Sequence, residues 1–294
     1  MLASPARRPL PAAFSDDDPV TGLEGMGRTI PPSRHFAMYT TTRYAAVTLF
    51  VGTPAAHSRI LVLLKHVLEI SVESVGAAVA AERGGAHRLE LCRDLSAGGI
   101  TPEEGLLRAV LSVVRLPVFA MIRPRSGGFV YSDAEFAVMK TSIARARELA
   151  IGGIVLGILT AEHCVDVPRT RALVKLAAPL PVTFHRAFDV TSDLSKSLED
   201  VLQTGATRIL SSGGAFNALA GAATLAFLRT VVKDRIKIVP GTGINPGNIA
   251  EVARITGAQE FHSGLGSVLP YATSDFSAFQ SQVQQMSAVL QEFA

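Results

Sequence analysis

The sequence has few of the residues on which several common protein classes depend. Among 294 residues there is no tryptophan, aromatic residues make up 6% and charged residues 18%. The only two cysteines, Cys92 and Cys164, are too few for a disulfide framework, so we expect a reducing, cytoplasmic compartment. Apolar runs are short, and the run Ile60 to Leu64 ends at Lys65, which predicts no membrane span.

The small excess of positive charge lies in the first part of the chain. Residues 1–66 hold seven Lys or Arg and four Asp or Glu, and the rest holds 21 of each, from totals of 28 and 25. Hydrophobic residues make up 48%, which excludes a disordered protein and is enough for one large core. Because residues 67–294 carry no net charge, the sequence does not predict a nucleic-acid partner.

Two parts of the chain differ in character. Residues 1–65 predict a flexible, poorly ordered N-terminal extension, because Pro, Ser, Thr and Arg recur there without a period. A transit peptide would be poor in acidic residues, and the acidic run 16–18 argues against one. Residues 66–294 alternate short runs of Val, Ile and Leu with segments of helical length. The predicted strands begin near Val67, Arg88, Val118, Gly153, Val182, Arg208, Ile236 and Glu260.

Start and stop signals of helices lie between these runs. The segment 101–104 (TPEE) predicts a helix with Thr101 as its N-cap and proline at its first position. Ser132 with Glu135 predicts a capping box, and Asn245 before a proline predicts a further helix start. Glycines that predict a left-handed helix end just before a strand are Gly85, Gly152, Gly205 and Gly257.

Eight repeats of strand, loop, helix and glycine predict an α/β fold, the TIM (β/α)8 barrel. The strands read as buried on both faces, as parallel strands are. The repeats fit the usual barrel length of about 250 residues. An open doubly wound sheet is the alternative, but it usually has fewer strands, and no G-x-G-x-x-G follows the first strand here.

Charged and polar side chains interrupt several of these apolar strands. A buried charge without a partner is costly, so each of them needs an ion pair, a metal or a ligand. The carboxyl ends of barrel strands meet at one opening, where function is located. The candidate catalytic residues are Glu69, Glu90, Arg123, His185, Asp189 and His262.

The chemistry of these groups indicates their roles. Arg123 is suited to bind a carboxylate or phosphate in bidentate fashion. Glu69 or Glu90 would act as general base and His185 as acid. The alternative is that Glu69, Glu90 and Arg123 form an internal ion-pair cluster that only fills the barrel.

Glycine-rich loops follow strands six, seven and eight. Glycine lets backbone N–H groups approach an anion, and the loops after strands seven and eight are common phosphate sites in such barrels. The same sequences also fit ordinary turns. The candidate ligand-binding residues are Ser212, Gly213, Gly241, Gly243, Ser263 and Gly264.

Five segments within residues 67–265 form a recognisable set of motifs. They are 68–74 (LEISVES), 81–92 (AERGGAHRLELC), 121–125 (MIRPR), 184–189 (FHRAFD) and 260–263 (EFHS). Together, and in this order, they resemble the CutC family of copper homeostasis proteins, and the agreement of five separate motifs makes the resemblance specific. The resemblance implies a TIM barrel, a homo-oligomer, a cytoplasmic location and Cu(I) as ligand.

The family pattern suggests two cysteine ligands for copper. The second falls on Cys92, which is the candidate metal ligand, whereas the first falls on Ser71. Because Cu(I) favours thiolate and thioether ligands, Cys164 and Met121 are further sulfur candidates.

Two functions of different classes follow. The first is a copper homeostasis protein that binds copper through Cys92, with Met121, His185 or a second subunit completing the site. The second is an enzyme of isomerase or lyase type that acts on a small anionic or phosphorylated metabolite. A barrel that has lost its chemistry is a third alternative, and the sequence leaves open whether the chain is an enzyme.

Overall fold

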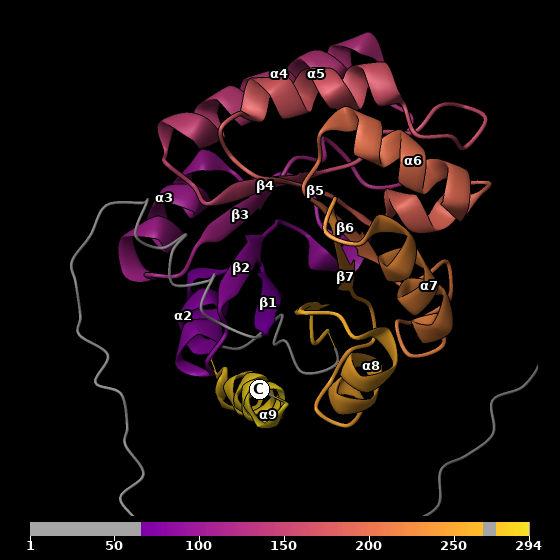
Figure 1. Cartoon of the computed structure of the whole chain (residues 1–294). Helices are drawn as coiled ribbons and strands as arrows, with labels where there is room; N and C mark the ends of the chain where they lie inside the picture. Colours follow the sequence, from indigo (N-terminus) through magenta and orange to yellow (C-terminus); the bar gives the residue numbers. More distant parts are fainter. Residues whose placement is uncertain (1–65, 267–274, 294) are drawn as a thin grey trace, which may run out of the picture. The chain divides into compact units, whose positions relative to one another are not determined.

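The chain forms a barrel of eight parallel strands in this computed structural model, which describes residues 66–266 and 275–293 (Figure 1). The strand order β7-β6-β5-β4-β3-β2-β1-β8 confirms the predicted TIM (β/α)8 barrel, and the open doubly wound sheet is wrong. β7 and β8 lie side by side and complete the ring without a hydrogen-bonded ladder between them. The strands are β1 (Val67–Val72), β2 (Arg88–Leu91), β3 (Val118–Met121), β4 (Gly153–Leu156), β5 (Val182–Phe184), β6 (Arg208–Ser211), β7 (Lys237–Pro240) and β8 (Glu260–Ser263).

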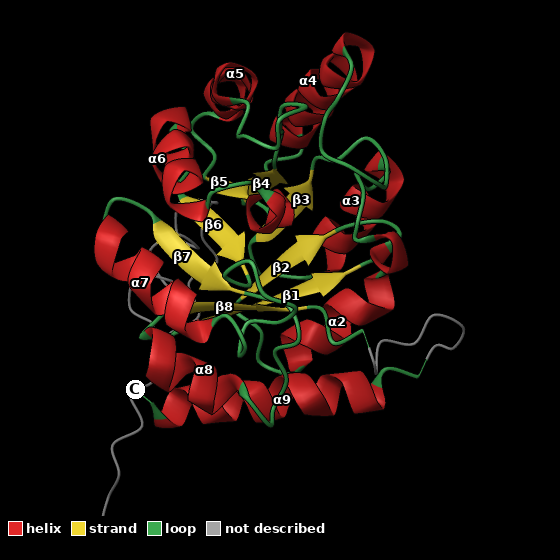
Figure 2. Ribbon diagram, turned by 90° about the vertical axis from the view of Figure 1, so that its right-hand side faces the viewer, coloured by secondary structure: helices red, strands yellow, loops and turns green. Residues whose placement is uncertain are grey.

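Helices alternate with the strands and surround the barrel (Figure 2). α9 packs against both α2 and α8, so it covers the part of the ring where β8 meets β1. None of the helices in the described ranges is long and apolar enough to cross a membrane. The predicted extension, residues 1–65, lies outside the described residues. The helices are α2 (Val75–Arg83), α3 (Glu104–Val113), α4 (Asp133–Glu148), α5 (Val167–Ala177), α6 (Leu194–Thr204), α7 (Ala222–Val232), α8 (Ile249–Thr256) and α9 (Ser277–Glu292).

Some of the predicted helix signals act as expected. Ser132 forms the capping box of α4: its hydroxyl accepts from the backbone N–H of Glu135, and the Glu135 carboxylate accepts from the N–H of Ser132. Gly205 and Gly257 end α6 and α8 in the left-handed conformation, with φ of 85° and 60°. These positions confirm the predicted local geometry.

Other signals were misread. α3 begins at Glu104, because the hydroxyl of Thr101 instead bonds the backbone N–H and C=O of Arg123. α8 begins at Ile249, after the turn that Asn245 opens. Gly152 is not left-handed; Ala150 takes that conformation after α4, with φ of 53°.

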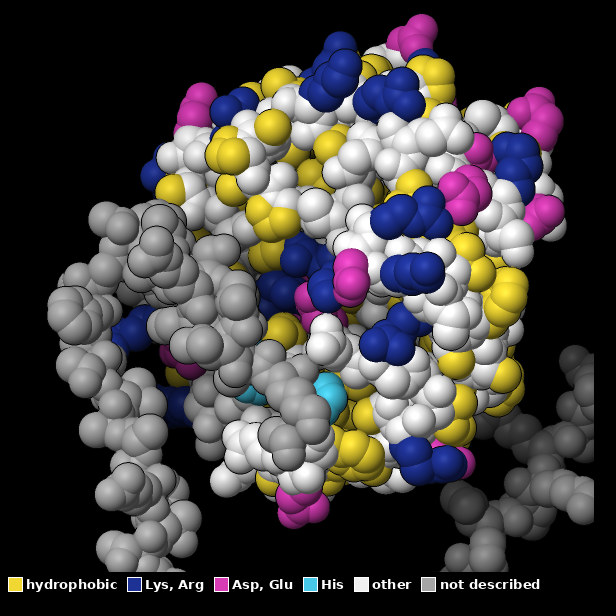
Figure 3. All heavy atoms as spheres, viewed as in Figure 1, with side chains coloured by type: hydrophobic (Ala, Val, Ile, Leu, Met, Phe, Trp, Pro, Cys, Tyr) yellow, Lys and Arg dark blue, Asp and Glu magenta, His cyan; other side chains and the backbone are white. Residues whose placement is uncertain are grey.

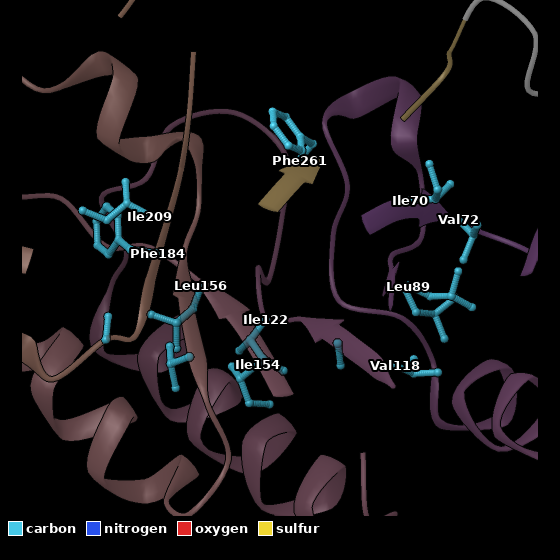
Figure 4. Close-up of a cluster of buried hydrophobic side chains, with 14 of the residues drawn as sticks. Ile70, Val72, Leu89, Val118, Ile122, Ile154, Leu156, Phe184, Ile209 and Phe261 are labelled. Atoms are coloured by element: carbon cyan, nitrogen blue, oxygen red, sulfur yellow. The ribbon is translucent and has the colours of Figure 1, made fainter. Parts of the chain in front are cut away.

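Alternate strand residues divide the buried side chains into two layers. The outward-pointing residues pack beneath the helices in a continuous apolar layer, which includes the fully buried Ile70, Leu89, Ile154 and Phe261 (Figure 4). The inward-pointing residues are largely polar. This division places the charged side chains of the strands inside the barrel rather than against the helices.

Candidate functional site

A network of ion pairs lies in the barrel interior, on the side away from the carboxyl ends of the strands. The Glu69 carboxylate pairs with Arg88, and its Oε1 lies 2.7 Å from Nδ1 of His262. Arg88 also donates to Glu260 over 2.6 Å. Burial would raise the pKa of Glu69, but Arg88 and the hydrogen bond from His262 hold it well below its usual range.

The network continues toward the carboxyl ends of the strands through Ser71. The Ser71 hydroxyl lies 2.8 Å from Nε2 of His262 and donates to Oε1 of Glu90 over 3.1 Å. Burial lowers the pKa of His262, but Glu90 and Glu69 together raise it above its ordinary value. Because the Ser71 hydroxyl donates its hydrogen to Glu90, it accepts from His262, which therefore does not act as its base. The connectivity of a Ser–His–Glu triad is present without the protonation state that a triad requires.

Cys92 lies at the end of this network. Its thiol donates to Oε1 of Glu90 over 3.4 Å and packs with Phe119, Met121 and Val155 in a small buried cluster inside the barrel. Burial raises the pKa of Cys92 well above its ordinary value, and the Glu90 carboxylate adds to this effect. The thiol is therefore protonated until something displaces the proton.

Within the described ranges, Glu69, Glu90 and His262 have ligand atoms within 4.8 Å of one another, close enough to surround a metal ion. Their donors are oxygen and nitrogen, which suit harder ions than Cu(I). Arg88 already pairs with Glu69, so this group also works as a structural network without a metal.

A cavity of about 550 Å³ opens at the carboxyl ends of the strands. Figure 3 shows Lys or Arg side chains together with Asp or Glu side chains in the hollow of this face, with histidine side chains beside them. The sequence-predicted residues that line it are Glu90, Arg123, His185, His262, Gly243, Ser263 and Gly264.

The other predicted site residues do not line the cavity. Glu69 and Cys92 are buried in the interior network, and Gly241 packs closely against Leu210. They lie deeper in the barrel, because the inward-pointing residues of the strands extend well below the cavity.

Asp189 also lies outside the lining, because the loop after β6 encloses its carboxylate. That carboxylate accepts hydrogen bonds from the Ser211 hydroxyl (2.5 Å) and from the N–H groups of Ser212 (3.0 Å) and Gly214 (3.1 Å). We predicted that Ser212 and Gly213 hold a ligand anion. The anion that this loop holds is a side chain of the protein itself.

Arg123 holds two loops together at the rim. Its Nη1 donates to the carbonyls of Ala97 and Gly99 over 3.1 and 3.0 Å, and its Nη2 to that of Gly127 over 2.7 Å. The predicted cluster of Arg123 with Glu69 and Glu90 does not form, because Arg123 makes no ion pair in the described part of the chain. Bidentate binding of a ligand by Arg123 stays a prediction.

His185 presents a neutral imidazole to the cavity. Its Nδ1 accepts from the N–H of Ala187 over 3.1 Å, which places the ring hydrogen on Nε2, and Nε2 has no partner among the described residues. Burial lowers the pKa of His185 to about 3, and Arg123 adds to this effect. The ring of Phe129 lies 5.0 Å from the imidazole.

Sequence analysis missed the arginines of the interior. Arg88 alternates with Glu90 along β2, a signal that could have placed both on the inward face. Arg208 stacks 4.2 Å from the Phe119 ring centroid and donates to Thr183, and burial lowers its pKa to about 9.

Comparisons with known proteins agree with the five sequence segments. The CutC family model matches residues 66–267. A family protein CutC of Chromobacterium violaceum is 47% identical over 197 residues, which cover 67% of this chain and 80% of that protein. The human copper homeostasis protein cutC homolog is 45% identical over 200 residues, which cover 68% and 73% of the two chains.

Solved structures agree as well. The crystal structure of a CutC protein of Streptococcus agalactiae superposes with a TM-score of 0.65 and 32% identity, covering 67% of this chain and 98% of that one. A phosphoribosylanthranilate isomerase of Thermotoga maritima, at 11% identity and a TM-score of 0.51, shares the fold alone, covering 77% and 99%. The family match and the identities above together show that this chain belongs to the CutC family.

Proposed function

We propose that this protein acts in copper homeostasis by binding copper as Cu(I). Its human and mouse relatives are named copper homeostasis proteins. The observation that carries the proposal is the packing of two sulfur side chains, Cys92 and Met121, in one small buried cluster. Both thiolate and thioether suit Cu(I).

The barrel register supports this pair of ligands. Leu91 of β2 pairs with Ala120 of β3, so the next residues, Cys92 and Met121, lie side by side on neighbouring strands. Adjacent strands are about 4.8 Å apart, a spacing over which one ion can bridge two sulfur atoms. The thioether of Met121 thereby takes the place of the first family thiol, which falls on Ser71 in this sequence.

The two sulfurs differ in their access to the cavity. Met121 lines it, whereas Cys92 is fully buried, and a Cβ atom at Gly99 would lie only 3.0 Å from its sulfur. Met121 is thus the donor that an entering ion meets first. Copper here is cargo, and the bond to Cys92 requires loss of the thiol proton.

Competition with a Cu(I) chelator tests this proposal on the reduced protein. We expect micromolar or tighter binding, which Cys92→Ser abolishes and Met121→Leu weakens at least about tenfold. Cys164→Ser is the matched control, because Cys164 lies outside the cluster, and it should bind as the wild type does. Failure of the wild-type protein to bind, or full binding by Cys92→Ser, contradicts the proposal.

The same proposal places the protein in the cytoplasm as a homo-oligomer. Both cysteines are unpaired, as is usual in a reducing compartment. Cell fractionation tests the location, and light scattering on the purified full chain tests the assembly. A monomer across the micromolar range contradicts the oligomer.

A further inference from the structure

Part of the barrel-mouth cavity has features that copper binding does not use. The copper proposal involves the ends of β2 and β3, whereas the cavity is also lined by the end of β5 and by the loops after β7 and β8. His185 and Arg186 follow β5, and Gly243, Ile244 and Gly264 belong to the two loops. These residues contain no sulfur and therefore indicate a different kind of ligand.

The charge of the lining favours an anion. Two arginines, Arg123 and Arg186, line the cavity, and among the described lining residues only Glu90 carries a carboxyl group. A concave surface of net positive charge concentrates anions.

Arg186 is fixed in place and still has capacity to bind. Its Nε donates to Asp189 over 2.9 Å and its Nη2 to the Ser212 hydroxyl over 3.3 Å, whereas Nη1 has no partner within the described ranges. Asp189 is also bonded by Ser211 and Gly214, so its charge is shared among several donors. An arginine positioned in this way is preorganised for an oxyanion.

His185 adds a second donor of a different kind. Its Nε2–H is buried and unpaired in the described part of the chain, which is unfavourable unless a ligand or water accepts the hydrogen bond. Because the ring is neutral, it contributes a hydrogen bond without adding charge. It therefore selects an acceptor oxygen rather than an anion in general.

Backbone groups of the two loops complete the lining. The N–H groups of Gly243, Ile244 and Gly264 make no hydrogen bond to any described residue. The Ser263 hydroxyl donates to the carbonyl of Ile244 over 2.6 Å and so fastens the two loops to each other. Unpaired amides in glycine loops are common ligands of phosphate and carboxylate.

We propose that this part of the cavity binds a small molecule that carries an oxyanion, a phosphate or carboxylate group, through Arg186, the Nε2–H of His185 and the loops after β7 and β8. The cavity of about 550 Å³ has the size of a metabolite site. The groups that bind the oxyanion do not include Cys92 or Met121, although Met121 lines the same cavity, so this proposal does not rest on copper binding.

Thermal unfolding and calorimetry of the copper-free, reduced full chain test the site. The probes are sodium phosphate and sodium malonate, each compared with sodium chloride at equal ionic strength. We expect one of them to raise Tm by about 3 °C at ten times its Kd. Binding of phosphate alone identifies a phosphorylated ligand, and binding of malonate alone identifies a carboxylate.

Matched variants separate this site from general charge effects. Arg186→Gln and His185→Asn should each weaken binding at least about tenfold. In the second variant the amide oxygen can still accept from the N–H of Ala187. Arg235→Gln is the control, because Arg235, which follows α7, forms an exposed pair with Glu199 of α6, and it should change Kd less than about twofold.

Two outcomes overturn the proposal. One is that neither probe raises Tm beyond the chloride control. The other is that Arg235→Gln weakens binding as much as Arg186→Gln does. If circular dichroism shows that the Arg186→Gln variant is unfolded, the oxyanion affinity of His185→Asn decides whether the proposal holds. Cys92→Ser should bind the oxyanion as the wild type does, so failure of the copper proposal is distinguishable from failure of this one.

Discussion

The ion pair between Glu69 and Arg88 is the interaction whose loss should destabilise the barrel most clearly. The two side chains are 1% and 3% exposed, so water does not replace a missing partner. Breaking such a buried pair typically destabilises a protein by about 3–5 kcal/mol. Because Arg88 keeps its second contact, with Glu260, we expect Glu69→Gln to lie near the lower limit, about 3 kcal/mol.

Urea unfolding followed by circular dichroism measures this change. For a slope of about 2–3 kcal/mol per molar, the midpoint should fall by about 1–1.5 M. Glu104→Gln is the matched control, because Glu104 pairs with Arg108 on the exposed face of α3, and it should cost less than about 0.5 kcal/mol. Equal effects of the two variants, or less than about 1 kcal/mol for Glu69→Gln, refute the reasoning.

The pH dependence provides a second check on the same pair. The folded pKa of Glu69 is lowered, so its contribution is fully present above the unfolded value of 4.5 and is lost as pH falls toward the folded pKa. The difference in stability between wild type and Glu69→Gln should therefore shrink as the pH falls below about 4.5. A difference that grows as the pH falls below this value contradicts this linkage.

Four further substitutions have defined outcomes. Gly157→Ala should move His185 and weaken oxyanion binding in calorimetry, because the new Cβ would lie 2.5 Å from the imidazole. At Gly105 a new Cβ meets open space, so Gly105→Ala should instead stabilise α3 by about 0.5–1 kcal/mol. Ala150→Gly should stabilise the protein by about 1 kcal/mol in urea unfolding, because φ of 53° strains alanine. Burial lowers the pKa of His185 to about 3 in the folded protein, whereas the unfolded chain titrates at 6.5. The free energy of unfolding therefore decreases as the pH is lowered from 6.5 toward 3. His185→Asn should remove about 1.4 kcal/mol per pH unit of that loss. Unchanged slopes, or a destabilised Ala150→Gly, contradict these expectations.

The strands were predictable because their signal is local. Alternation of Val, Ile and Leu with glycine-ended helices located seven strand starts at the observed residue and placed the other at Ile236 rather than Lys237. The fold class followed from counting these units. Helix starts were less secure, since Thr101 and Asn245 form hydrogen bonds within loops that a local pattern does not distinguish from caps.

The partners of the charged side chains could not be predicted in the same way. Glu69 meets Arg88 because the register of β1 and β2 pairs them directly, although they are 19 residues apart. Asp189 is enclosed by the loop after β6 only once β5 and β6 are adjacent. Sequence identifies which residues carry charge inside a barrel, but closure of the ring decides which of them neutralise one another.

The polar side chains inside the barrel limit which substitutions its interior can accept during evolution. Glu69, Arg88, His262 and Glu260 are connected, so a substitution at one leaves another without its counter-charge. An apolar interior tolerates stepwise exchanges of similar volume, but this one requires compensating replacements. We therefore expect related chains to vary at these positions in concert, whereas the apolar layer beneath the helices drifts residue by residue.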